Sequence, residues 1–425
     1  MAGVNHPRWR TATRACIALV CALACLTAVT SAAQAATPPA ISAVNAFSAL
    51  QLPLAGLTPQ LAAIQGHGVT TVRGDAPWGQ IEPAPPGPLG HVWQWATTDA
   101  RVAALAAHHL TWQPVLDYSV WWAKTCPGFC APSSNSTYAA FAQAVAARYG
   151  AGGSFWAQNP QLPYRPVQIF EIWNEENVST YSIPATQYGP LYSAARTAIH
   201  AVDPQADVII GGLADDGQAF NASQDYPKWF INQLFTADPS LVGQVDGFGL
   251  HPYGANASAV EQWVVDFRNA LTSWNEGSAP IYITEIGWQT GSTTTETWRA
   301  QQMSSVALTL SHSNCGIAYM APYTWINPLS LNEPGDFGLV DRSALTTTLR
   351  PAGTAWFNGL TQAASHPVNA LCPAQASTTQ ATTPSTTASS TKTKTGARTA
   401  SVTSSRVRHH RRHRRHRRHH RRQHA

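Results

Sequence analysis

After residue 35 the sequence contains no apolar run of about 20 residues, the length that a helix needs to cross a bilayer. It is also poor in charge, because Asp, Glu, Lys and Arg make up only 12% of its 425 residues. No acidic residue occurs before Asp75 or after Asp341. We therefore expect no transmembrane segment beyond the N-terminal region, and two chain ends that differ in character from the middle.

Residues 1–35 are typical of a secretory signal peptide. Three arginines precede an apolar run at residues 15–29, and Ala33-Gln34-Ala35 fits the small-x-small cleavage pattern. A single membrane anchor is the alternative, but the run is short for a span. We predict cleavage after Ala35 and a secreted or extracytoplasmic protein, located outside the cell, at its surface or in a periplasm.

Cysteine is scarce once this segment is removed, since only Cys126, Cys130, Cys315 and Cys372 remain. An even number of cysteines in a secreted chain suggests two disulfides. Cys126 and Cys130 could close a small loop, which would leave Cys315 to pair with Cys372. No Cys/His cluster has the spacing of a zinc site, so we expect neither a metal nor an organic cofactor.

The C-terminal end combines low complexity with positive charge. Residues 376–405 form a Ser/Thr-rich linker that cannot bury enough apolar surface to fold. Residues 406–425 form a tail of alternating Arg and His. Together these segments carry 13 basic and no acidic residues, whereas residues 36–375 carry a formal charge of 11 − 22 = −11. The tail could contact anionic cell-surface polymers or remain without a single partner, and no motif indicates specific nucleic-acid binding.

Residues 36–375 form one domain in which strand-like and helix-like segments alternate. The predicted strands lie near 43–47, 69–75, 110–117, 167–174, 207–212, 244–250, 281–284 and 316–324, and the predicted helices near 59–65, 99–108, 138–148, 187–202, 226–236, 259–274, 296–311 and 352–360. Most strands are short apolar runs, as expected for strands covered on both faces. Eight strands alternating with eight helices predict an α/β fold, the (β/α)₈ TIM barrel.

Two segments that end in glutamate carry the strongest chemical signal. Residues 170–175 read Phe-Glu-Ile-Trp-Asn-Glu, and residues 281–285 read Ile-Tyr-Ile-Thr-Glu. Glu175 and Glu285 are 285 − 175 = 110 positions apart, but on the predicted layout they follow the fourth strand and end the seventh, at the barrel's C-terminal face. Hydrolysis of a glycosidic bond needs two carboxyl groups facing each other across the sugar. The pair therefore predicts a glycoside hydrolase.

A family resemblance extends this interpretation. Trp173-Asn174-Glu175 resembles the Trp-Asn-Glu motif of clan A retaining glycoside hydrolases, and residues 284–288, Thr-Glu-Ile-Gly-Trp, resemble their strand-seven nucleophile segment. The resemblance runs from about residue 69 to residue 325 and is nearest to the family 39-like and family 5-like branches. It implies that Glu175 is the acid/base, that Glu285 is the nucleophile, and that Asn174 binds the sugar 2-hydroxyl.

Other elements of the clan follow in order. Residues 250–253, Leu-His-Pro-Tyr, resemble the strand-six element, which implies that Tyr253 contacts the nucleophile and that His251 lines the neighbouring subsite. Arg73 resembles the strand-two arginine that supports the nucleophile. Trp325 would end strand eight as an aromatic platform for the sugar. Structural roles are the alternative for His251 and Arg73.

One position departs from the clan, because the residue after the acid/base glutamate is often proline and here is Glu176. A like charge beside Glu175 would raise its pKa. Position in the motif favours Glu175 as the acid/base, with structural roles for Glu171 and Glu176. Five tryptophans after strands two and three fit either sugar subsites or core: Trp78, Trp93, Trp95, Trp121 and Trp122.

The sequence thus predicts a secreted retaining β-glycoside hydrolase that cleaves O-glycosidic bonds in a poly- or oligosaccharide by double displacement. The alternative is a non-catalytic carbohydrate-binding or surface-adhesion protein on the same barrel. The intact pair of glutamates favours the enzyme. No motif fixes the sugar, the linkage, endo or exo action, or hydrolysis against transglycosylation.

Overall fold

Eight parallel strands close into a barrel in the computed structural model, which describes residues 41–214, 226–291, 294–327, 336–341 and 347–374. Each strand pairs with its neighbours in chain order, and β1 pairs with β8 to close the ring. The strands are β1 (Ile41–Asn45), β2 (Thr71–Asp75), β3 (Thr111–Leu116), β4 (Ile169–Ile172), β5 (Asp207–Ala214), β6 (Gly247–His251), β7 (Ile281–Ile286) and β8 (Ile317–Pro322). The predicted TIM barrel is confirmed.

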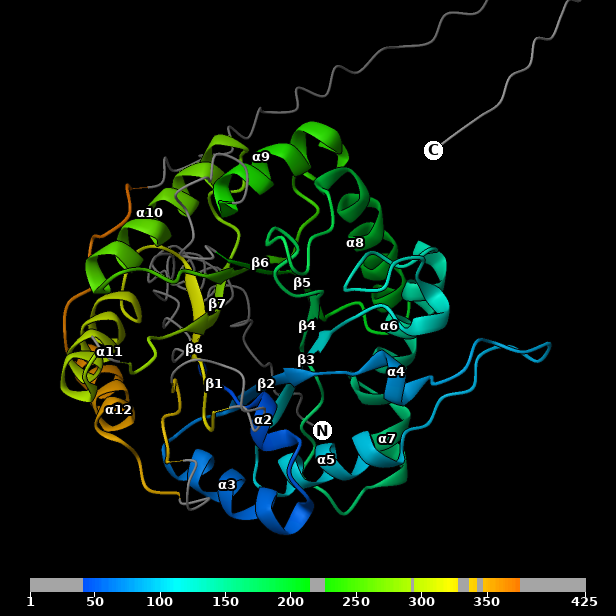
Figure 1. The fold of residues 1–425 in the computed structure, drawn as a ribbon, viewed down its shortest axis with the longest axis horizontal. Helices are drawn as coiled ribbons and strands as arrows, with labels where there is room; N and C mark the ends of the chain where they lie inside the picture. Colours follow the sequence, from blue (N-terminus) through cyan, green and yellow to red (C-terminus); the bar gives the residue numbers. More distant parts are fainter. Residues whose placement is uncertain (1–40, 215–225, 292–293, 328–335, 342–346, 375–425) are drawn as a thin grey trace, which may run out of the picture. The chain divides into compact units, whose positions relative to one another are not determined.

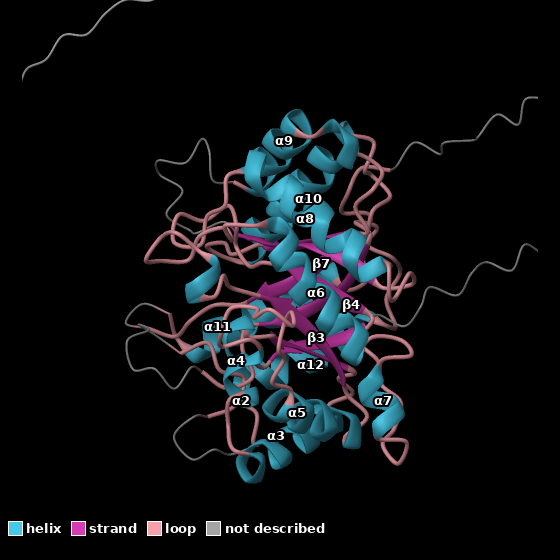
Figure 2. Ribbon diagram, turned by 90° about the vertical axis from the view of Figure 1, so that its right-hand side faces the viewer, coloured by secondary structure: helices cyan, strands magenta, loops and turns pink. Residues whose placement is uncertain are grey.

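Helices surround this barrel, as seen from one end in Figure 1 and from the side in Figure 2. The longer ones are α3 (Leu54–Gly66), α5 (Ala96–Ala107), α6 (Asn135–Tyr149), α8 (Ala185–His200), α9 (Pro227–Ala237), α10 (Ala257–Ser273), α11 (Glu296–Leu310) and α12 (Pro351–Ala363). Each corresponds to a predicted helix. Short helices α2 (Phe47–Leu50), α4 (Trp78–Ile81) and α7 (Ser154–Gln158) were not predicted, because single turns carry too few residues to show a period.

Local sequence accounts for several helix starts. Ser134, Asn256 and Thr295 precede α6, α10 and α11, and each side-chain oxygen accepts a hydrogen bond from a backbone N–H in the first turn. Such caps satisfy donors that a helix start would otherwise leave without partners. Helix α3 begins at Leu54 rather than at the predicted residue 59, so Pro59 lies inside it.

The barrel interior changes from apolar to polar along the strands. Ile169 of β4 belongs to a small buried cluster with Ala43, Ile209, Tyr282, Tyr319 and Ala321. Glu171 lies two residues further along β4 and therefore points to the same face. It is fully buried and bonds Arg73 of β2 and Gln113 of β3. A charged layer thus underlies the C-terminal face of the barrel.

Both predicted disulfides are present. Cys126 pairs with Cys130, and Cys315 pairs with Cys372, which ties the end of the described chain to the segment before β8. The predicted signal peptide (1–35), linker (376–405) and basic tail (406–425) lie outside the described residues. Among the residues that are described, every helix is too short or too polar to cross a membrane.

Candidate active site

The backbone after β4 leaves regular structure at the Trp-Asn-Glu motif. Trp173 and Glu175 have positive φ values of 70° and 55°, which are uncommon for residues other than glycine. The buried Trp173 indole anchors this turn by donating to the carbonyl of Tyr181 at 2.9 Å. The backbone N–H of Glu175 donates to the carbonyl of Gly212 on β5 at 3.2 Å. Backbone of this kind persists only where the surrounding structure holds it in place, and it clusters at functional sites.

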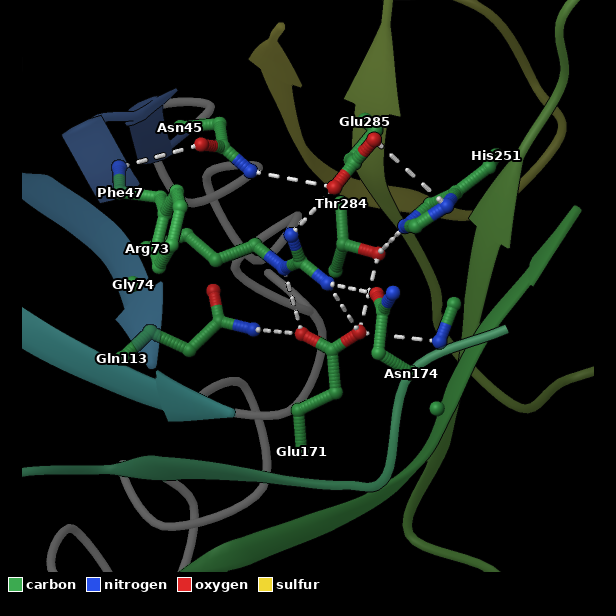
Figure 3. A network of polar contacts seen from close by, with 12 residues as sticks. Asn45, Phe47, Arg73, Gly74, Gln113, Glu171, Asn174, His251, Thr284 and Glu285 are labelled. Carbon is green, nitrogen blue, oxygen red and sulfur yellow. Dashed lines mark hydrogen bonds and ion pairs between the residues drawn. The ribbon is translucent and has the colours of Figure 1, made fainter. Parts of the chain in front are cut away.

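Glu285 on β7 is bonded at both carboxylate oxygens. Its Oε1 accepts from Arg73 Nη1 at 2.7 Å and from Asn45 Nδ2 at 3.2 Å (Figure 3). Its Oε2 accepts from the Tyr253 hydroxyl at 2.7 Å. Burial and the charge of Glu285 raise the pKa of Tyr253 well above its usual value, so this hydroxyl keeps the proton that it donates. Three donors therefore orient the Glu285 carboxyl group.

Glu175 faces His251 of β6, with Nδ1 and Oε1 separated by 3.0 Å. His251 is fully buried, and its Nε2 lies 3.0 Å from the Thr284 hydroxyl. Burial, with a smaller opposing effect of Glu285, lowers the pKa of His251 to about 4. A Cβ at Gly212 would lie 2.0 Å from Nε2, so only glycine leaves room for this ring.

Arg73 joins the two sides of the site. It donates from Nε and Nη2 to the two oxygens of Glu171 at 2.7 and 2.9 Å, and from Nη1 to Glu285. Its Nη2 also donates to Asn174 Oδ1 at 2.7 Å, and Asn174 Nδ2 donates to the Tyr118 hydroxyl at 3.1 Å. Burial alone would lower the pKa of Arg73, but Glu171 and Glu285 raise it well above its usual value.

One oxygen of Glu175, one of Glu285 and one ring nitrogen of His251 lie within 4.8 Å of one another. Two carboxylate oxygens and an imidazole nitrogen are atoms that can bind a metal ion. However, Glu285 is already bonded by Arg73, and a guanidinium at 2.7 Å opposes a cation on the same carboxylate. The arrangement suits two facing carboxyl groups beside a neutral imidazole rather than a metal centre.

Glu176 points away from this cluster. Its carboxyl is fully buried, and a Cβ at Gly211 would lie 2.5 Å from its Oε2. Burial raises the pKa of Glu176 well above its usual range. The neutral form is therefore favoured, so Glu176 does not place a second negative charge beside Glu175.

No family model and no curated protein matches this chain in sequence. Solved structures do match it. A family 39 glycoside hydrolase from Bacteroides cellulosilyticus WH2 is 22% identical, with a TM-score of 0.55 over 76% of this chain and 64% of that one. A monomeric β-xylosidase from Caulobacter crescentus CB15 is 16% identical, with a TM-score of 0.55 over 75% and 67%. GH5_18 from Streptomyces cattleya, in complex with GlcNAc, is 12% identical, with a TM-score of 0.57 over 78% and 82%.

The chain has the fold of these glycoside hydrolases. The expected likeness to the family 39 and family 5 barrels is confirmed at that level, and at these identities the comparisons show the fold alone. The matched part of this glycosidase-like barrel spans less than two thirds of the Bacteroides protein.

Six of the seven predicted site residues lie together in this barrel: Arg73, Asn174, Glu175, His251, Tyr253 and Glu285. Trp325 is the exception and corrects the prediction of an aromatic platform. Its indole is 0% exposed, and its Nε1 donates at 2.8 Å to Gln60 of α3, behind the barrel wall. Tyr323, two residues earlier, is partly exposed and contacts Phe337, which lies next to Tyr253.

Sequence reasoning missed several other side chains near the pair. Asn45 at the end of β1 bonds Glu285, and Thr284 bonds His251. Asp75 ends β2, and Asp117 follows β3. Burial raises the pKa of Asp75 to about 7 and raises the pKa of Asp117 well above its usual value. Their position at predicted strand ends was the available signal, since barrel sites are built from such positions.

Proposed function

We propose that this protein is a retaining β-glycoside hydrolase that cleaves O-glycosidic bonds by double displacement, with Glu285 as nucleophile and Glu175 as acid/base. The observation that carries the proposal is the approach of their carboxylate oxygens to within 4.8 Å. Retaining enzymes hold the two carboxyl groups about 5–5.5 Å apart, whereas inverting enzymes leave about 6.5–9.5 Å for a water. The short separation favours the retaining geometry.

The environments of the two carboxyl groups also differ in the way that the proposal needs. Glu285 accepts hydrogen bonds from Arg73, Asn45 and Tyr253, which fix the orientation that a nucleophile needs. Glu175 instead faces the nitrogen of a histidine whose buried ring is neutral at pH 7. A neutral imidazole adds no positive charge beside Glu175, which fits the role of acid/base.

In the first step Glu285 attacks the anomeric carbon while Glu175 gives its proton to the leaving oxygen. In the second step Glu175 takes a proton from water, and the resulting hydroxide releases the sugar from Glu285. Asn174 is held by Arg73 and Tyr118 beside Glu175, where its amide would bond the sugar 2-hydroxyl. The substrate is a poly- or oligosaccharide. Two disulfides fit action outside the cytoplasm.

The deciding experiment is hydrolysis of a panel of aryl β-glycosides and polysaccharides by the mature protein beside Glu285→Ala and Glu175→Ala. Glu285→Ala should lose turnover and recover it with azide, giving a glycosyl azide of inverted configuration. Glu175→Ala should keep activity on substrates with good leaving groups, which need little protonation. Its azide product should retain configuration.

Glu176→Gln is the matched control, because it changes the neighbouring carboxyl that points away from the site. It should keep most of the activity that Glu175→Ala loses. A wild-type protein that binds glycans but cleaves none of a broad panel would overturn the proposal and favour a carbohydrate-binding protein.

A further inference from the structure

We propose that Thr284 is a positioning residue that fixes the tautomer of His251 and thereby keeps a proton on Glu175 in the resting protein. The inference rests on the proposed roles of Glu175 and Glu285, and it adds a residue that the pair does not include. Thr284 is fully buried on β7, directly before Glu285, and contacts neither catalytic carboxyl group in the hydrogen bonds of the described residues.

The chain of hydrogen bonds starts at Glu171, which acts only as an acceptor. Its two oxygens accept from Arg73 Nε and Nη2, from Gln113 Nε2 at 2.9 Å and from the backbone N–H of Gly212 at 2.9 Å. All of these partners, a guanidinium among them, are donors, and a carboxylate is the form that accepts from them all. The Thr284 hydroxyl lies 3.3 Å from Glu171 Oε1, and a carboxylate cannot donate, so the hydroxyl donates to it (Figure 3).

The direction of the next two bonds follows. Because the Thr284 hydrogen is used on Glu171, its oxygen must accept from His251, which puts the imidazole proton on Nε2. A neutral histidine with a proton on Nε2 has only a lone pair on Nδ1. Nδ1 lies 3.0 Å from Glu175 Oε1, so a hydrogen bond forms there only if Glu175 is protonated and donates.

Charged and titratable groups reach His251 from several strands. Glu171 lies on β4 and Glu175 just after it, Glu285 lies on β7, Arg73 lies on β2, and Tyr253 follows β6. Burial is the largest influence and lowers the pKa of His251; Arg73 lowers it as well, while Glu285 and Glu171 raise it. The net result is a ring that stays neutral near pH 7.

The direction of these hydrogen bonds, from Glu175 to His251 and from His251 to Thr284, serves both steps of the proposed reaction. When the glycosidic bond breaks, the Glu175 O–H turns from Nδ1 to the leaving oxygen and transfers its proton, as Glu285 bonds to the anomeric carbon. The new Glu175 carboxylate then faces the Nδ1 lone pair, which disfavours its charge. It therefore takes a proton readily from the attacking water, whose hydroxide displaces Glu285. The starting protonation state is restored without any other acid or base.

The tautomer can be read without turnover. ¹⁵N-histidine spectra of the full mature chain should show one buried ring with a protonated Nε2 and an unprotonated Nδ1, assigned by its loss in His251→Asn. In Thr284→Val the hydroxyl is replaced by a methyl of similar size, and the proton should move to Nδ1. Thr284→Ser should keep the wild-type tautomer. A wild-type ring protonated on Nδ1, or an unchanged ring in Thr284→Val, overturns the proposal.

Kinetics supply the second readout. With the proton on Nδ1, His251 donates to the Glu175 carboxylate and favours its ionised form. The basic limb of the kcat/KM profile should then move to lower pH, with about a tenfold loss near pH 7 on a poor leaving group, part of the 10²–10⁴ typical of general acid catalysis. Substrates with good leaving groups should change less. If wild type cleaves no glycoside, the proposed function fails, while the spectra still decide the tautomer.

Discussion

Arg73 on β2 donates to Glu285 at the end of β7 across 2.7 Å, although 212 positions separate the two residues. The same guanidinium forms a two-pronged contact with Glu171, which is fully buried. One cation therefore supports the proposed nucleophile and compensates a charge that has no access to water. Replacing it should affect activity and stability together.

Arg73→Lys should lower the free energy of unfolding by about 3 kcal/mol, the order expected when a buried charge loses its partner. A lysine offers a compact ammonium in place of a planar fork, so it cannot reach Glu171 and Glu285 at once. The urea concentration at the unfolding midpoint and kcat should both fall. Arg196→Lys is the control, because its contact with Asp246 is partly exposed and should be worth less than about 1 kcal/mol. Equal losses in the two variants would contradict the role of Arg73.

Tyr323 and Trp325 should separate binding from stability. Tyr323→Ala removes the partly exposed ring near Tyr253 and should raise KM with little change in melting temperature. Trp325→Phe should leave KM unchanged but cost about 1–3 kcal/mol, because buried Gln60 Oε1 loses the indole donor. A rise in KM for Trp325→Phe alone would restore the original assignment of Trp325 as the sugar platform.

Asp75→Asn should change how stability depends on pH. Burial raises the pKa of Asp75 from 3.8 to about 7, so between these values the folded protein binds a proton that the unfolded chain has released. This group therefore lowers stability as pH rises from about 4 to 7. The folding equilibrium constant of Asp75→Asn, relative to wild type, should rise by up to about tenfold per pH unit over that window. Urea midpoints from pH 4.5 to 7.5 measure it, and a flat difference would refute the shift.

Removal of residues 378–425 should separate catalysis from surface retention. Turnover of small soluble substrates should stay unchanged, because the site residues, from Asn45 to Tyr323, all precede this segment. Retention on anionic polymers at low salt should weaken, because 13 basic residues are lost and exposed charges act most strongly when screening is low. The measurement is salt-dependent pull-down with an acidic polysaccharide. Equal retention by both forms would show that the tail does not bind such surfaces.

Much of the fold could be predicted from short apolar runs, because barrel strands that are covered on both faces do not alternate apolar with polar residues. The same runs made Glu175 and Glu285 recognisable in the sequence, since a carboxylate at a strand end interrupts an otherwise apolar pattern. Asn45 and Thr284 were missed because an amide at a strand end and a hydroxyl inside one look like ordinary sequence. Their roles depend on partners 240 and 33 residues away.

The sequence by itself determined the barrel and the strands that carry the candidate residues, because these depend on period and chain order. It only suggested the two disulfide pairs, which the structure then showed. Only the tertiary structure decided which side chains of one motif meet. It turned Glu175 to His251 and buried Glu176, and it sent Trp325 to Gln60 while leaving Tyr323 near Tyr253. Residues next to each other in a strand point to opposite sides, so a shift of one position separates the site from the core. Beyond the end of a strand this alternation stops, and only the folded chain shows where each side chain points.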